Sequence, residues 1–438
     1  MDGLALTGIF LFVLFLLLGS GVWVALALLG VGVVGMELFT ARPAGDAMIT
    51  TIWRSSSSWT LTALPLFIWM GEILFRTRLS EDMFKGLAPW MVNWPGRLLH
   101  TNVVGCTVFA AVSGSSAATM TTVGKMSIPE LRRRGYPEPM IIGTLAGAGT
   151  LGLMIPPSLI LIVYGVTINE SISKLFIAGV FPGLTVAFLF MGYVALWSTI
   201  NADKIPIAGE DRLPLGEKIR QSGGLLPILG LVIAVLGAIY TGLATATEAA
   251  SFGVVGALAL AWLQGSLNRE SFSQSLMGAV RTSAMIAFIL MGASFLSLSM
   301  GFTGLPRALA EWIAYLELSP LMLIAALTLF YIMIGCFLDG ISAVVLTMAV
   351  VEPMVRSAGI DMIWFGVFIV VVVEMAQITP PVGFNLFVMQ GITGHDILYV
   401  AKTALPFFLL LMLMVALLVA FPGIATWLPE QMAQGPNV

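Results

Sequence analysis

Two stretches of the chain, 224 residues apart, carry the same pattern of proline, arginine and glycine. The first stretch has Pro129, Arg132, Gly135 and the pair 156–157, and the second has Pro353, Arg356, Gly359 and the pair 380–381. Proline and glycine are the residues expected to persist where membrane helices break. The pattern therefore predicts an internal structural repeat, with a helix break at the Pro-Pro pair of each half.

The composition places this repeat in a membrane. Of the 438 residues, 58% are hydrophobic and 10% are charged, whereas soluble domains have about 25% charged residues. We therefore predict an all-α polytopic protein in contact with the lipid bilayer. No basic tract suggests nucleic acid, and the lone residues Cys106 and Cys336 show neither metal-ligand nor redox spacing.

Apolar runs and polar interruptions divide the chain into successive helices. The run 4–39 is interrupted at 19–21, a polar patch covers 41–58, a helix is expected at 61–75, and an interfacial amphipathic arm at 76–97. After the long polar loop 201–221, helices are expected at 225–240, 249–263, 283–300 and 402–421, with a polar arm at 266–274 and an amphipathic segment at 305–316.

A stretch rich in serine and threonine, 112–124, interrupts the apolar sequence just before Arg132. Broken, hydroxyl-rich backbone is tolerated in hydrocarbon only where it lines a cavity or binds a ligand. We interpret this stretch as the turn of a first helical hairpin and 321–355 as a second. The runs 140–168 and 362–390 are each too long for one simple span and are expected to be broken helices.

Basic residues give the orientation of the two halves. If Arg132 and the loop 201–221 are both cytoplasmic, as the positive-inside rule prefers, the two hairpins enter from opposite sides of the membrane. The expected fold is an inverted repeat with about ten crossings, two re-entrant hairpins and two broken helices. Two ordinary transmembrane helix pairs remain an alternative interpretation of the hairpins.

Several motifs together resemble the large membrane subunit of tripartite ATP-independent periplasmic (TRAP) transporters. The resemblance covers essentially the whole chain and rests on LPLFIWMGE at 64–72, SGSSAAT at 113–119, GTLGLMIPPS at 149–158, TATEAA at 245–250, GCFLDG at 335–340 and TPPVGFNLF at 379–387. One departure is Ala246, where the family often has a proline.

This resemblance implies a function and an architecture. It implies a sodium-coupled importer of organic anions of the carboxylate or sialic-acid class, in a bacterial inner membrane. A periplasmic binding protein would deliver the substrate, and a small membrane subunit of about four helices would be a second partner. The mechanism would be an elevator, with transport segments 101–169 and 317–391 sliding against scaffold segments 1–100 and 170–316, and with 392–438 as last helix and tail.

Broken helices suit this task, since free N–H groups can hold a carboxylate and free carbonyls can coordinate sodium. Each half is expected to offer one site made of oxygen ligands, the kind that hard cations prefer. The first sodium site is predicted from Ser113, Ser115, Ser116, Thr119, Gly149, Thr150 and Gly152, and the second from Asp339, Gly340, Ser342, Gln377, Thr379 and Pro380. The predicted substrate contacts are Ser116, Asp339, Pro157 and Pro381.

Other interpretations of these residues stay open. Serine and threonine hydroxyls in membrane helices often bond back to their own carbonyls. Glu374 is predicted either to brace the second broken helix or to act in function, whereas Glu72 and Glu248 are expected to pair with arginine or to cap helices. His100 and His395 are expected to be loop or boundary residues.

The sequence offers no catalytic triad, no metal-ligand spacing and no phosphate-binding loop with a lysine, so an enzyme is not expected. A stand-alone sodium-coupled dicarboxylate or citrate carrier, working without a binding protein, is the main alternative function. A channel is disfavoured because selective pores normally come from symmetric subunits.

Overall fold

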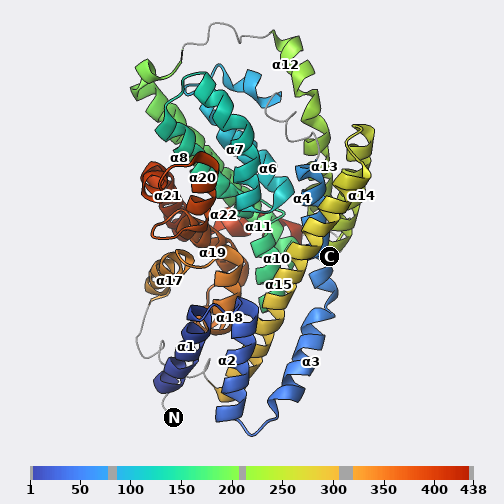
Figure 1. Ribbon diagram of the computed structural model, residues 1–438, viewed down its shortest axis with the longest axis vertical. Helices are drawn as coiled ribbons and strands as arrows, with labels where there is room; N and C mark the ends of the chain where they lie inside the picture. Colours follow the sequence, from blue (N-terminus) through green and yellow to red (C-terminus); the bar gives the residue numbers. More distant parts are fainter. Residues whose placement is uncertain (1–2, 77–85, 207–213, 305–318, 434–438) are drawn as a thin grey trace.

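The computed structural model describes residues 3–76, 86–206, 214–304 and 319–433, and all regular elements within these ranges are helical (Figure 1). The first-half helices are α1 (Gly3–Gly19), α2 (Val24–Phe39), α3 (Ala44–Ser56), η1 (Trp59–Thr62), α4 (Ala63–Phe75), α6 (Leu99–Ser113), α7 (Ser116–Arg133), α8 (Glu138–Gly149), α9 (Leu151–Met154), α10 (Leu159–Ile168) and α11 (Ile172–Ile200).

The remaining elements begin within the polar loop 201–221, which contains η2 and α12. They are η2 (Ala202–Lys204), α12 (Leu215–Gln221), η3 (Ser222–Gly224), α13 (Leu226–Tyr240), α14 (Ala246–Leu263), α15 (Arg269–Thr303), α17 (Pro320–Gly335), α18 (Gly340–Ser357), α19 (Met362–Gln377), α20 (Phe384–Thr393), α21 (Ile397–Ala420) and α22 (Gly423–Ala433).

Both predicted helix breaks are present at the Pro-Pro pairs. In the first half, α9 ends before the pair and α10 begins after Ser158, whose hydroxyl accepts from Leu161 N. In the second half, α19 ends at Gln377 and α20 begins after Gly383, which has a positive φ of 52°. Proline has no N–H to donate and clashes with the preceding turn, so neither helix continues through its pair. Both Pro-Pro bonds are cis.

The structure corrects two sequence expectations. The polar patch 41–58 contains helix α3, which begins after Pro43 and has Asp46 in its first turn and Arg54 in its last, charges that complement the helix dipole. The polar arm 266–274 and the helix 283–300 are one continuous helix, α15. Asn268 and Ser271 cap its start reciprocally, and no proline interrupts the residues between the two expected segments.

Two further expectations fall partly or wholly outside the described residues, and a third is confirmed. Much of the arm 76–97 and all of the segment 305–316 lie outside the described residues. The expected break at 19–21 separates α1 from α2, and α22 is an additional helix beyond the expected last helix.

The helices form two neighbouring groups in Figure 1. The long helix α15 packs against α2, α3 and α4, and α4 packs in turn against α14. In the other group, α6 and α7 pack against each other and against α8, while α19 packs against α17 and α21. Helix α11 contacts members of the second group, including α6, α19 and α21. The two hairpins and the two broken helices therefore lie together, beside the α15 group.

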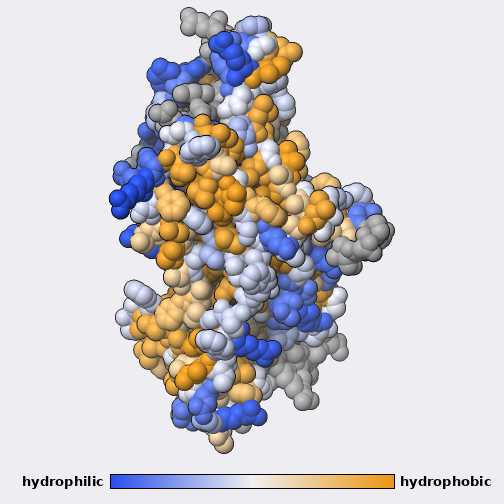
Figure 2. All heavy atoms as spheres, turned by 90° about the vertical axis from the view of Figure 1, so that its right-hand side faces the viewer, coloured by the Kyte–Doolittle hydropathy of each residue, from blue (hydrophilic) through white to orange (hydrophobic). Residues whose placement is uncertain are grey.

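Length and composition are consistent with several membrane crossings. Among the described residues, six helices are long and apolar enough to cross a membrane, or eight if each of two bent helix pairs is one span. Figure 2 shows apolar side chains over much of the molecule, with hydrophilic ones at its upper and lower ends and in patches on the right-hand part of this face. The expectation of ten crossings stays a prediction.

Candidate functional site

The tip of the first hairpin packs on the first helix break. Gly114 ends α6 in a left-handed conformation with φ of 58°, and a Cβ there would lie 2.8 Å from the Pro157 carbonyl oxygen. The next residue, Ser115, caps α7 by accepting from Ala118 N at 3.4 Å. Glycine is thus needed at the tip both for the turn and for the close approach to the break.

A second close approach joins the same tip to the helix just before the break. A Cβ on Gly152 would lie 2.6 Å from the Ser115 carbonyl oxygen and 2.6 Å from Ser116 Cα. Gly149, one turn earlier, faces the Met120 side chain. The predicted residues of the first site therefore converge through backbone contacts.

The hydroxyls of the first site differ in what they contact. Ser113 Oγ lies 2.7 Å from Thr119 Oγ1, so these two side chains bond to each other across the tip. Thr150 donates to Gly147 O at 2.7 Å, within its own helix. The Thr150 hydroxyl is therefore bonded back to its own helix, which is the alternative interpretation of these hydroxyls. The Thr150 backbone lies beside the break.

Ser116 reaches across to the other half of the chain. Its hydroxyl donates to Glu374 Oε2 at 2.8 Å, although the two residues are 258 positions apart in sequence. Asn385 Nδ2, on α20, lies 3.5 Å from the same oxygen. Glu374 is 0% exposed and is the single buried carboxyl side chain among the described residues. This carboxyl therefore links the first hairpin with both parts of the second broken helix.

The second hairpin also meets its break. Asp339 caps α18 by accepting from Ser342 N at 3.2 Å. A Cβ on Gly340 would lie 2.7 Å from Gln377 Nε2, at the end of α19. At the end of α17, the Cys336 carbonyl accepts from Gly383 N at 3.0 Å.

The backbone of the second break carries carbonyl groups outside regular helix. A Cβ on Gly383 would lie 2.7 Å from the Thr379 carbonyl oxygen and 2.9 Å from that of Gln377. The Pro380 carbonyl lies 3.5 Å from Cys336 Sγ, and the Thr379 hydroxyl donates to Met375 O within α19. Thr379 therefore has its carbonyl, rather than its hydroxyl, turned toward the break.

The two breaks differ in exposure. All residues from 151 to 160, Pro157 included, are buried, whereas Pro380 and Pro381 are exposed and Asp339 is half-buried. The first break is thus enclosed in this structure, whereas Ser113 and Ser115 of the tip beside it are half-buried, and the second break is open at its Pro-Pro pair.

The α15 group touches the first hairpin at its tip. A Cβ on Gly71 of α4 would lie 2.8 Å from the Val112 carbonyl oxygen and 3.3 Å from Ser113 Cα. This contact is made between backbones, so the two helix groups meet closely beside the first site.

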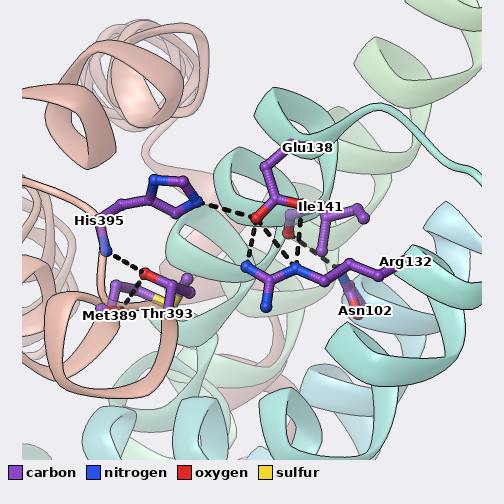
Figure 3. A network of polar contacts seen from close by, with 7 residues as sticks. All are labelled: Asn102, Arg132, Glu138, Ile141, Met389, Thr393 and His395. Atoms are coloured by element: carbon purple, nitrogen blue, oxygen red, sulfur yellow. Dashed lines mark hydrogen bonds and ion pairs between the residues drawn. The ribbon is translucent and has the colours of Figure 1, made fainter.

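A polar network holds the base of the first hairpin (Figure 3). Arg132, at the end of α7, binds Glu138 at the start of α8 with Nε 3.0 Å from Oε2, and His395 Nε2 lies 3.0 Å from Glu138 Oε1. Nearby, the guanidinium groups of Arg133 and Arg134 hold the pKa of Glu130 below its usual value. The network ties the hairpin to the loop before α21.

Two acidic residues have the structural roles expected of them. Glu72 pairs with Arg76 at 2.9 Å, and Glu248 forms a capping box with Thr245 at the start of α14.

The residues predicted to bind sodium or substrate did not include Glu374 or Asn385. An acid directly after the valine run 370–373, in a strongly apolar segment, was a signal for Glu374, but no sequence pattern pairs it with Ser116.

Hairpin tips packed on broken helices, in an all-helical chain with several apolar spans, define a polytopic membrane protein with broken helices. A solved structure has a similar fold: the Alcanivorax borkumensis YdaH transporter matches with a TM-score of 0.66 and 15% identity, over 94% of this chain and 98% of that one.

Residues 9–424 match the family described as tripartite ATP-independent periplasmic transporter, DctM component, and the chain belongs to this family. It is therefore a transporter permease of the bacterial inner membrane rather than an enzyme. The large C4-dicarboxylate TRAP permease DctM of Pseudomonas aeruginosa is 31% identical over 86% of this chain and 88% of its own length.

Relatives with other named solutes are similar to the same degree. The ectoine/5-hydroxyectoine large permease UehC of Ruegeria pomeroyi is 29% identical over 84% of this chain and 86% of its own length. The isethionate permease DctMQ of Oleidesulfovibrio alaskensis is 29% identical over 95% of this chain, which matches 64% of that longer protein.

Proposed function

We propose that this permease imports an organic anion, of the carboxylate or sialic-acid class, driven by an inward sodium gradient. The observation that carries the proposal is that each hairpin tip meets a helix break, through Gly152 in the first half and Gly383 in the second. Such breaks combine free carbonyls for a cation with free N–H groups for an anion.

Four helices begin around these contacts and could hold the substrate. They are α7, α10, α18 and α20, two from the hairpins and two from the broken helices. Helix N-termini attract carboxylates through unpaired N–H groups and the helix dipole. Because no arginine lies in the helix breaks or in the two tips, substrate selectivity would depend largely on a periplasmic binding protein. The named solutes of the relatives, from C4-dicarboxylates to ectoine, agree with a tolerant permease site.

The two sodium sites are assigned to the two contacts between tip and break. The first would use Ser113, Ser115, Ser116, Thr119 and the backbone at Gly149, Thr150 and Gly152; the second would use Asp339, Gly340, Ser342, Gln377, Thr379 and Pro380. In the elevator, the hairpins and broken helices would slide along the α15 group, and Gly71 would be one point of contact between the moving and fixed parts.

Uptake into proteoliposomes tests this function. The chain is reconstituted with its small membrane subunit and given a binding protein loaded with radiolabelled dicarboxylate, with sodium outside. Uptake that collapses when choline replaces sodium supports the proposal, and no uptake under the gradient overturns it. Uptake of free substrate by the chain alone would instead establish the stand-alone carrier.

A further inference from the structure

A groove with mostly apolar walls lies beside α17, α19, α21 and α22. It has a volume of about 260 Å³, and its walls include Leu321 of α17, Trp364 of α19, Val419 of α21 and Pro422. The Trp364 ring is fixed in this wall because its Nε1 donates to the Leu418 carbonyl oxygen at 3.1 Å. Leu321 is 62% exposed, so the groove opens on the outer face of α17. Its lining suits a hydrocarbon chain.

A second cavity, with charged walls, adjoins this groove. It has a volume of about 480 Å³ and is lined by Glu170, Arg356 and Asp361 among others. Ile360 and Asp361, in the turn before α19, line both the charged cavity and the apolar groove. Charged side chains at helix ends, next to an apolar surface, are typical of the boundary between lipid tails and headgroups. The two spaces together therefore have the polarity of a phospholipid, charged at one end and apolar at the other.

The charged groups of the second cavity are only partly paired within the protein. Arg356 Nε donates to Glu352 at 2.9 Å and Nη2 lies 3.4 Å from Glu170 Oε1, whereas Nη1 has no partner in the described part of the chain. Asp361 accepts from Trp364 N at 2.7 Å and forms no ion pair with another described residue. One arginine with free N–H groups therefore lies beside three carboxylates, which leaves an excess of negative charge.

We propose that the apolar groove and the charged cavity together bind one phospholipid with an amine headgroup, a phosphatidylethanolamine. One acyl chain lies in the groove, the phosphate accepts from Arg356 Nη1, and the ammonium group donates to Asp361 and Glu170. A guanidinium group suits a phosphate, and an ammonium group has three N–H donors for the carboxylates. Phosphatidylglycerol carries the phosphate without an ammonium group and leaves the two acids uncompensated.

This lipid connects segments that are far apart in sequence. Its headgroup contacts the turn between α18 and α19 and also Glu170, in the loop between α10 and α11, while its acyl chain contacts α17, α21 and α22. The lipid therefore braces the base of the second hairpin against the loop that follows the first broken helix. None of these contacts uses a residue assigned to sodium or substrate, so the inference is independent of the proposed sodium-driven uptake.

Native mass spectrometry of the full chain, purified and stripped of lipid, tests this site without sodium or substrate. Phosphatidylethanolamine, phosphatidylcholine and phosphatidylglycerol with identical acyl chains are titrated separately. Phosphatidylethanolamine should bind about tenfold more tightly than the other two, because each of these lacks the charge-assisted hydrogen bonds of the ammonium group. Glycerophosphoethanolamine, which has the same headgroup without acyl chains, should not bind at these concentrations, since nothing then fills the groove.

Four variants locate the lipid. Arg356→Gln and Asp361→Asn should each weaken binding of phosphatidylethanolamine by about tenfold, and asparagine at 361 keeps an acceptor for Trp364 N. Thr426→Trp places a large side chain in the groove and should weaken all three phospholipids alike. Arg132→Gln is the matched control, because Arg132 corresponds to Arg356 at the base of the first hairpin, and it should bind lipid as the wild type does.

The contrary outcomes are equally specific. Equal binding of the three phospholipids shows annular lipid only and overturns the site, and tighter binding of phosphatidylglycerol overturns the amine headgroup. Binding of glycerophosphoethanolamine as tight as that of the whole lipid removes any role for the groove. Thermal unfolding checks the fold of each variant. If Arg356→Gln unfolds because Glu170 and Glu352 lose their partner, Asp361→Asn decides alone, and unchanged lipid binding in that variant overturns the proposal.

Discussion

The two contacts between hairpin tip and helix break share a plan but differ in how tightly they close. The first has a fully buried helix break, approaches Gly152 through backbone atoms, and is bridged to the opposite half by Ser116 and Glu374. The second has a half-buried Asp339 and an exposed Pro-Pro pair. Repeated backbone geometry therefore does not bring repeated chemistry: a buried carboxyl group, Glu374, contacts the first tip, and a half-buried one, Asp339, lies on the second tip.

The largest effect is expected from adding a side chain at Gly152, where the first hairpin tip lies too close to leave room for one. Gly152→Ala would place a Cβ 2.6 Å from backbone atoms of Ser115 and Ser116, which cannot move as a flexible side chain can. We expect overpacking of about 1–3 kcal/mol and loss of most sodium-dependent uptake. Uptake and sodium-dependent thermal shift are the measurements.

A matched control is Gly192→Ala in α11, where a Cβ would meet nothing within 4 Å. It should behave as the wild type. The counterpart of Gly152 in the second half is already an alanine, Ala376, so unchanged uptake in Gly152→Ala would show that the first contact is no tighter than the second.

An intermediate effect is expected from substitution of Asp339, the half-buried acid at the tip of the second hairpin. Asp339→Ala removes both the cap of α18 and the carboxylate, and losing a cap costs about 0.5–2 kcal/mol. Asp339→Asn keeps an acceptor for Ser342 N but removes the charge. We expect the asparagine variant to unfold at nearly the wild-type temperature and yet to need more sodium for half-maximal stabilisation.

The sodium dependence of the variants tests whether the Asp339 carboxylate binds sodium and whether the two hairpin tips differ. If Asp339→Asn and Asp339→Ala have the same sodium dependence as the wild type, the carboxylate acts only as a helix cap. The two sites should also differ in sodium affinity, so identical dependence in Ser116→Ala and Asp339→Asn would contradict the asymmetry between the tips.

The smallest effect is expected at the base of the first hairpin. Arg132→Gln breaks the bond to Glu138 in the network of Figure 3, where both partners are partly exposed. Pairs of this kind contribute about 0–1 kcal/mol and are screened by salt. Thermal unfolding at low and high salt measures the loss, which should shrink as salt rises; Arg220→Gln, which breaks an exposed pair in α12, is the control.

The sequence predicted the parts of this architecture that depend on local chemistry. The Pro-Pro pairs predicted both helix breaks, because proline has no N–H to donate and clashes with the preceding helical turn. Gly114 marked the tip of the first hairpin. Helix α3 was missed because its polar residues resemble a loop, although its charges suit its dipole. The bond between Ser116 and Glu374 could not be predicted, since it depends on how two distant segments pack.

The approach of Gly71 to the first hairpin has an evolutionary consequence. Because the contact is with the Val112 carbonyl and the Ser113 backbone, it places little demand on the identity of the neighbouring side chains. Related permeases could therefore exchange the serines and threonines of the tip, and so adapt to new solutes or ions, without refitting the surface on which the hairpin rests. Glycine at position 71 should then vary less among them than the hydroxyls beside it.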